Sequence, residues 1–253
     1  LVIDPTLIFS TFTGSRSDNW GYTATYGPDG SLFSGGIVFG NGFPVSVGAF
    51  QTTFNANNGQ SPFNMGIMKF DPTGVQRVYA TYLGGNETDQ PHSLIVDGQG
   101  NLIIAGRSAS GDYPALQTYG TPGGWDIVLT KLNAAGTARI GSIRVCGSGG
   151  DGINTGDSHS GSPRGLLNFY GDDARSEVIL DNAGNIYLAS CTQSADFFTT
   201  PNAPYKTLKG TQDAVLIKTN PNLSTLFTST YFGGSDMDAA FVLGVNPVGG
   251  DIW

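Results

Sequence analysis

A strand that recurs along the chain is the feature that most constrains the fold. Four segments share a short strand that ends in glycine, and they cover residues 10–14, 80–85, 142–147 and 229–234. The offsets between their first residues are 70, 62 and 87. Self-similarity of this kind is the signature of a repeat architecture, in which each unit packs against its neighbours. The spacing is longer than that of a β-solenoid, and a sandwich would not repeat its sequence.

Further strands accompany the recurring one in each unit. Residues 93–106 contain two apolar runs around an Asp-Gly-Gln-Gly turn, and residues 177–189 and 24–33 repeat this pattern. A third apolar run closes each unit, at residues 65–74, 126–136 and 213–222. Turns of Asp, Asn and Gly between apolar runs predict hairpins. Four antiparallel strands in a unit of about 70 residues are typical of a β-propeller blade.

The sequence therefore predicts an all-β fold, a β-propeller of four-stranded antiparallel blades. We expect residues 1–253 to be part of a single propeller, with blades at 13–82, 83–145 and 146–231 and a partial blade at 232–253. A closed ring needs at least about four blades. The prediction is thus an incomplete ring or a fragment. The start without Met and the end inside a strand-like run lead us to expect a mature or partial chain.

The composition excludes several classes of protein. Glycine supplies 38 of the 253 residues and charged residues only 13%, which does not suit a coiled coil or a helical bundle. A hydrophobic content of 39% excludes a disordered tail. No run of about 18 apolar residues is present, so we expect no direct membrane insertion. The net charge of -8 disfavours nucleic acid as a partner, because phosphate binding requires a basic face.

Several short motifs carry a resemblance to a known family. They are an aromatic residue before Gly-Gly, Val-Asp-x-x-Gly-Asn at 96–101, Phe-Pro at 43–44, and Asp-x-x-x-x-Lys followed by an apolar residue and Asn at 126–133. In this combination the chain resembles the bacterial SBBP β-propeller repeat. The third unit departs from the pattern, because Cys146 stands in its glycine turn and Phe198 replaces the expected proline.

The resemblance implies a location as well as a fold. SBBP repeats are common in secreted proteins of Bacteroidetes, often upstream of a sorting domain for type IX secretion or gliding motility. The family thus implies an exported protein that is extracellular, on the cell surface or associated with the outer membrane. It also implies a role in adhesion or protein binding, or as a component or cargo of such a system. It identifies no ligand, because propellers host many functions.

Three acids follow the glycine turns at nearly the same place, namely Asp18, Asp89 and Asp238. We expect their carboxylates to accept backbone hydrogen bonds in a tight corner. The alternative is one carboxylate per blade that lines a channel or binds Ca²⁺. A lysine also recurs in the third run of each unit, for example at Lys69 and Lys131, and we expect it to pair with these acids.

One segment breaks the period, because residues 147–176 hold the excess of the longest offset. Long insertions on a rigid scaffold often carry binding sites. The candidate ligand- or partner-binding residues here are Asp151, Asp157, His159, Arg164, Tyr170 and Asp172. Asp151, Asn154 and Asp157 are also candidate Ca²⁺ ligands, although their spacing is not that of an EF-hand loop. The alternatives are a surface loop without a partner and a contact with a glycan or protein.

Two tryptophans and two cysteines complete the candidate set. Trp20 and Trp125 do not recur between units, so they are candidates for stacking on a ligand such as a sugar ring. Aromatic packing between blades is the alternative. Cys146 and Cys191 allow one disulfide in an exported protein, and two buried free thiols are the alternative that we favour. His92 is expected to be structural, because it has no zinc-ligand spacing.

The sequence shows neither a Gly-x-Ser-x-Gly elbow nor a Cys-x-x-Cys motif, and we assign no catalytic residue. We therefore expect a non-catalytic module that binds or scaffolds other proteins or surface glycans, with no cofactor apart from the Ca²⁺ considered above. The alternative is a carbohydrate-active hydrolase or lyase that uses Asp residues at the mouth of the propeller. That activity requires a pair of carboxyl groups with raised pKa values that face a cavity.

Overall fold

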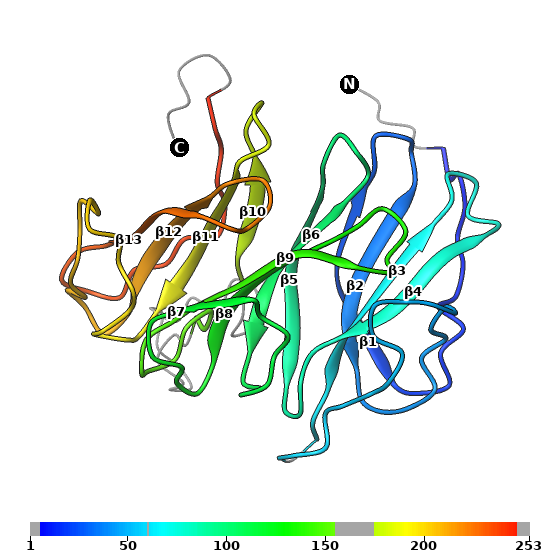
Figure 1. The fold of residues 1–253 in the computed structure, drawn as a ribbon, viewed down its shortest axis with the longest axis horizontal. Coiled ribbons are helices and arrows are strands. Elements are labelled where there is room, and N and C mark those ends of the chain that lie inside the picture. Colours follow the sequence, from blue (N-terminus) through cyan, green and yellow to red (C-terminus); the bar gives the residue numbers. More distant parts are fainter. Residues whose placement is uncertain (1–5, 60, 155–174, 247–253) are drawn as a thin grey trace.

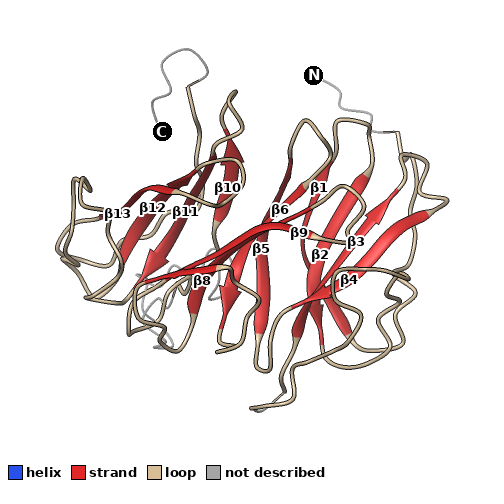
Figure 2. Cartoon of the chain, in the orientation of Figure 1, coloured by secondary structure: helices blue, strands red, loops and turns tan. Residues whose placement is uncertain are grey.

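The structure is a computed structural model that describes residues 6–59, 61–154 and 175–246. Over these residues the chain forms β-strands joined by turns and loops, and none of them is helical (Figures 1 and 2). A helix with the length and hydrophobicity of a membrane span is accordingly not found in the described part of the chain.

The strands form three sheets in chain order, and neighbouring strands of the four-stranded pattern run antiparallel. The first sheet, blade 1, contains β1 (Asn19–Tyr26), β2 (Leu32–Val38), β3 (Asn64–Phe70) and β4 (Arg77–Leu83). The second, blade 2, contains β5 (Asp89–Val96), β6 (Leu102–Ser108), β8 (Asp126–Leu132) and β9 (Arg139–Val145), and the short β7 (Gln117–Tyr119) lies parallel to β9. The third, blade 3, contains β10 (Glu177–Leu180), β11 (Ile186–Thr192), β12 (Asp213–Thr219) and β13 (Leu226–Phe232). The predicted all-β fold with four-stranded antiparallel blades is confirmed, and the open sheets fit an incomplete ring.

The hairpins between the first two strands are closed by an aspartate. In blade 2, Asp97 Oδ1 accepts hydrogen bonds from the backbone N–H groups of Gln99 and Asn101, both at 2.9 Å. Gly100 completes this turn with φ of 80°, a conformation that glycine adopts without strain. Asp181 closes the corresponding turn of blade 3 in the same way. These local bonds explain why the Asp-x-x-Gly-Asn motif predicts the hairpins.

The three blades lie side by side, with their first strands next to one another, because β5 contacts both β1 and β10 (Figure 1). We call the face that a blade turns toward the blade before it the leading face, and the opposite face the trailing face. Two apolar cores fill the interfaces. One joins the trailing face of blade 1 to the leading face of blade 2, and the other joins blade 2 to blade 3 in the same sense.

A pair of residues with complementary size lies at each interface. At the first, the ring of Tyr79 in β4 lies against Gly136, so that a Cβ on this glycine would come within 2.5 Å of the ring. At the second interface the sizes are reversed. Gly141 takes the place of Tyr79 in the strand register, and Leu223, also with positive φ, takes the place of Gly136. The exchange of large for small keeps the interface filled, as close packing requires.

The recurring lysines do not pair with the acids that follow the glycine turns, so this expectation was wrong. Lys131 lies 2.8 Å from Asp97 and Lys69 lies 3.9 Å from Asp29, and both aspartates belong to hairpin turns. The physical reason is strand geometry. Each lysine stands near the end of the third strand of its blade. The acid Asp89 lies at the opposite end, because its carboxylate contacts Asn64 at the start of β3.

Candidate binding groove

Asp89 anchors the corner between blades 1 and 2. Its carboxylate accepts hydrogen bonds from Ser108 Oγ (2.5 Å), Ser110 Oγ (2.9 Å) and the N–H of Gly85 (2.9 Å). Asn64 Nδ2 of the preceding blade donates a fourth bond at 3.0 Å. Burial raises the pKa of Asp89 to about 6, against the effect of these hydrogen bonds. The position matches the expected corner role of this acid.

Asp151 has the same role between blades 2 and 3, which the sequence interpretation missed. Its carboxylate accepts bonds from Thr192 Oγ1, from Ser194 Oγ (2.8 Å) and from the N–H of Gly147 (2.7 Å). Burial raises its pKa to about 7, and the charge of Asp126 contributes to the increase. A sequence signal was present: Asp151 stands four residues after a turn glycine, as Asp89 and Asp238 do.

The register also corrects the first member of this series. Asn19 pairs with Val38 as Asp89 pairs with Ser108, so Asn19 occupies the corner position of blade 1 and the expected Asp18 lies one residue before it. The corner series is thus Asn19, Asp89, Asp151 and Asp238. Asp238 Oδ2 accepts a hydrogen bond from the N–H of Gly234 at 2.6 Å, in keeping with this role.

The candidate Ca²⁺ ligands of the insertion have other partners where they are described. Asp151 is bonded as above, and Asn154 Oδ1 accepts a hydrogen bond from Gln212 Nε2 at 3.1 Å. Within the described residues, no three His, Cys, Asp or Glu side chains gather in a way that would hold a metal ion. The remaining candidates of this segment lie outside the described residues. They are Asp157, His159, Arg164, Tyr170 and Asp172.

The register locates the insertion within the first strand of blade 3. Asp151 bridges to Thr192 at the start of this strand, and β10 resumes at Glu177. At the corresponding place in β5, the pairing skips His92, which forms a bulge between Pro91 and Ser93. The chain therefore extends a bulge position into a long segment, which explains why the repeat continues on both sides of it.

Four further residues singled out in the sequence are buried or covered. Cys146 and Cys191 are free and buried in the structure, so the allowed disulfide is not formed, and burial raises the pKa of each thiol to about 12. Trp125 is half-buried, and the guanidinium of Arg107 lies 4.1 Å from its ring centroid. His92 is half-buried with Nδ1 2.9 Å from Ser176 Oγ, and burial of its ring lowers its pKa.

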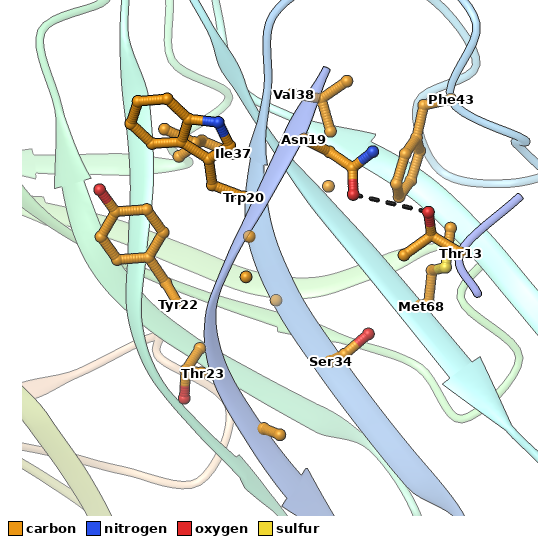
Figure 3. Close-up of a pocket in the computed structure, with 15 residues that line it drawn as sticks. Thr13, Asn19, Trp20, Tyr22, Thr23, Ser34, Ile37, Val38, Phe43 and Met68 are labelled. Atoms are coloured by element: carbon orange, nitrogen blue, oxygen red, sulfur yellow. Dashed lines mark hydrogen bonds between the residues drawn. The ribbon is translucent and has the colours of Figure 1, made fainter. Parts of the chain in front are cut away.

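Trp20 differs from these candidates because it lines an open groove on the leading face of blade 1 (Figure 3). The groove has a volume of about 410 Å³ and is mostly apolar. Trp20 is 59% exposed, and its ring packs edge-on against Phe39 at 5.1 Å. Figure 3 shows Trp20 and Tyr22 at one side of the groove and Phe43 and Met68 at the other.

Small side chains create the groove. The positions that fill the interface core in blade 2 carry Leu94, Ile104 and Val128, and those of blade 3 carry Val178, Leu188 and Val215. The strand register places Ala24, Ser34 and Gly66 at these positions in blade 1. Blade 1 therefore presents a leading face that lacks three aliphatic side chains present in both of the other blades.

A bulge in β1 fixes Trp20 above this hollow. The pairing of β1 with β2 skips Tyr22, as that of β5 with β6 skips His92. The bulge brings the carbonyl of Trp20 over Gly36, where a Cβ would collide with it, and Gly106 has the same relation to Gln90. The glycine in the second strand thus accommodates the bulge, which places the Trp20 backbone over the groove, while the indole lies on the side of its pairing partner Ile37 (Figure 3).

The groove has the chemistry of a binding surface. Its residues include no carboxylate, imidazole, amine or thiol group. Hydroxyl and amide groups lie among the apolar ones, and Thr13 Oγ1 donates to Asn19 Oδ1 at 3.5 Å beside the groove (Figure 3). An exposed indole beside small residues and hydroxyl groups can take an apolar or ring-shaped ligand surface. The hydroxyl groups of the lining belong to residues such as Tyr22 and Ser34, and no carboxylate or imidazole of the described lining stands beside them.

Comparison with known families identifies one segment. A β-propeller repeat of the SBBP type matches residues 78–114. This segment begins in β4, continues through β5 and β6, and ends in the loop before β7. It thus joins the last strand of one blade to the first two strands of the next and contains Asp89 and Tyr79 of the interface. No curated protein was found that matches the chain.

Proposed function

We propose that this β-propeller repeat protein is a non-catalytic module that binds or scaffolds other proteins or surface glycans outside the cell. The open groove beside Trp20 carries the proposal, because it is a partly apolar surface whose described lining includes no carboxylate or imidazole group. The resemblance to SBBP repeats of Bacteroidetes supports an extracellular or outer-membrane-associated location. It also supports a role as an adhesin, or as a component or cargo of a type IX secretion or gliding-motility system.

The alternative, a carbohydrate-active hydrolase or lyase, requires carboxyl groups that reach a substrate. Asp89 and Asp151 have raised pKa values, as catalytic acids often do. Both side chains are fully buried, however, and hold turn N–H and hydroxyl groups. Their pKa values thus reflect burial at blade corners, which favours the binding role.

A binding experiment with a turnover control tests the proposal. We expect the purified chain to bind a defined surface glycan or cell-surface protein with saturation, and Trp20→Ala to weaken that binding at least tenfold. Tyr26→Ala, at a β1 residue that is 79% exposed and does not line the groove, is the matched control and should bind as the wild type does. Release of cleaved saccharide that is lost in Asp151→Asn would support the enzyme instead.

A further inference from the structure

A second cavity lies where blades 2 and 3 meet, on the side of the hairpin turns (Figure 1). Its volume is about 500 Å³, which is within the range of ligand pockets. The turns at 97–101, 181–184 and 221–222 form its walls, and Lys131 of β8 and Ile140 of β9 also line it. We call it the junction cavity. Both of its sides belong to this chain, so no further blade is needed to define it.

Lys131 is the buried charged group of this cavity. Its side chain is only 5% exposed. The ammonium lies 2.8 Å from Asp97 Oδ2 and donates a hydrogen bond to the carbonyl of Pro221 at 2.9 Å. An ammonium has three N–H donors, so one of them has no partner among the described residues. A buried charged donor without an acceptor is unfavourable, and an acceptor atom in the cavity would stabilise it.

The lysines at the same register position in the other blades have a different environment. In blade 1, Lys69 Nζ lies 5.0 Å from the ring centroid of Phe33. In blade 3, Lys218 Nζ lies 4.7 Å from that of Tyr187. The corresponding partner in blade 2 is Ile103, which offers no aromatic ring. The lysine of blade 2 is therefore not held in the way that serves the fold in its neighbours.

The approach of blade 3 to this lysine depends on a glycine. Gly141 is the register partner of Lys131, and a Cβ at this glycine would collide with the carbonyl of Asn222. The register partner of Lys69 in blade 1 is Tyr79, which is buried. The contact between the blade 2 lysine and the turn of blade 3 is thus particular to this junction.

The two carboxylates of the cavity have no acceptor position left. Asp97 receives the N–H groups of Gln99 and Asn101, the amide of Asn101 and the ammonium of Lys131. Asp181 likewise accepts hydrogen bonds from four donors of its own blade. A carboxylate has about four acceptor positions, so neither acid is free to hold a cation. Two carboxylates and one ammonium leave a net negative charge, which disfavours an anion.

The rim of the cavity carries free amides. Gln99, Asn182 and Asn222 line it and are exposed. The side-chain bonds that close the three turns come from other residues, for example from Asn220 in the last of them. An amide group both donates and accepts hydrogen bonds. Leu180 and Ile140 add apolar surface to the same cavity. The cavity thus offers a buried donor, mixed polar groups at its rim and a small apolar area.

We propose that the junction cavity binds a neutral saccharide unit. A sugar hydroxyl can accept from Lys131, and other hydroxyls can exchange hydrogen bonds with the amides at the rim, because a hydroxyl group both donates and accepts. The C–H groups of the ring can pack on the apolar area. The site lies at a different junction from the groove beside Trp20, so the inference goes beyond the proposed function and does not depend on it.

Titration calorimetry of the full chain with D-glucose, D-galactose and D-mannose tests the inference. We expect at least one of these hexoses to bind with saturation. The dissociation constant should be millimolar, because a ligand of this size makes few contacts. The uronate of the same sugar is the charged counterpart and should bind at least fivefold more weakly, since its carboxylate enters a cavity with net negative charge.

Variants of the rim and of the lysine locate the binding. The double variant Asn182→Ala, Asn222→Ala changes exposed side chains and should weaken hexose binding at least tenfold. Asn202→Ala, at an exposed asparagine between β11 and β12 that does not line the cavity, is the matched control and should bind as the wild type does. Lys131→Met should also weaken binding at least tenfold. Near-ultraviolet circular dichroism checks its fold, and the rim variant decides the matter if it does not fold.

Four outcomes would overturn the inference. They are the absence of binding by all three hexoses, a uronate that binds as tightly as its hexose, binding that the rim variant leaves unchanged, and binding of triglycine in place of a sugar. Trp20→Ala separates this site from the proposed function and should leave hexose binding unchanged. Binding that is lost in Trp20→Ala and kept in the rim variant would assign the sugar to the groove, so the proposed function would stand and this inference would fail.

Discussion

The leading faces of blades 1 and 2 share their topology, the bulge in the first strand and the glycine that faces it from the second strand. Only the face of blade 2 is filled, however. In blade 2, Leu94, Ile104 and Val128 form part of a core with blade 1. In blade 1, Ala24, Ser34 and Gly66 leave a groove of about 410 Å³. The difference shows that the backbone of a repeat is set by its turns and bulges, whereas the use of each face is set by a few side-chain volumes.

Tyr79→Ala tests the filled side of this comparison and should have the largest effect. Tyr79 is only 2% exposed and fills the space above Gly136. Its removal should lower the free energy of unfolding by about 3–5 kcal/mol. Phe9→Ala, where the ring lies against Gly74 of blade 1 as that of Tyr79 lies against Gly136, should cost roughly 1 kcal/mol, because this ring is partly exposed. Urea denaturation measures both, and equal losses would contradict the comparison.

Exchanging the face residues themselves sharpens the contrast. Ile104→Ser gives blade 2 the residue of blade 1 and should lower the free energy of unfolding by about 2–4 kcal/mol. Ser34→Ile makes the reverse change in the groove and should alter stability by less than about 1 kcal/mol. It should also reduce binding at Trp20. A large loss of stability in Ser34→Ile would mean that the groove is already closed.

The reversed pair between blades 2 and 3 offers a double-mutant cycle. Gly141→Tyr should lower the free energy of unfolding by about 1–3 kcal/mol, because the new ring meets Leu223 and the adjoining backbone. Combining it with Leu223→Gly should recover part of the loss, since the pair then matches Tyr79 and Gly136. Additive losses in chemical denaturation, with no recovery, would show that the two positions do not interact.

The smallest effect that we expect is a pH dependence of the free energy of unfolding, which comes from the buried corner acids. Burial raises the pKa of Asp151 to about 7, so the folded state holds a proton that the unfolded state releases near pH 4. Stability from this group is therefore present at low pH and falls as pH rises from about 4 to 7. The lowered pKa values of Asp97 and Asp181 have the opposite sign, and their stability contribution is lost only as the pH falls below about 4, outside this window.

Thermal melts of the wild type and Asp151→Asn at several pH values isolate the contribution. The difference in melting temperature between them should change across pH 4–7 and stay constant above that range. Because the amide side chain introduced by this substitution retains one acceptor oxygen, the variant should still fold. A difference that is the same at every pH would show that Asp151 has an ordinary pKa.

Local sequence patterns were sufficient for the blades and hairpins, because a turn such as 97–101 closes with its own side chains. The corner acids needed more. The sequence points to Asp18 instead of Asn19, because Ser15 replaces the second glycine of the first turn and obscures the register. Asp151 was grouped with the insertion that follows it. The groove could not be predicted, because it depends on comparing Ser34 with Ile104 across a sheet register that only the structure supplies.

The exchange of Tyr79 and Gly136 for Gly141 and Leu223 also bears on the order of the blades. If the last strand of blade 1 met the turn of blade 3, a tyrosine would collide with a leucine. If the last strand of blade 2 met a turn that carries a glycine, as the turn of blade 2 carries Gly136, then Gly141 and that glycine would leave a void. Repeats with interchangeable surfaces can assemble in the wrong sequence during folding. Here each interface has a different combination of a large and a small residue, so blades that meet in the wrong order pack poorly as soon as they come into contact.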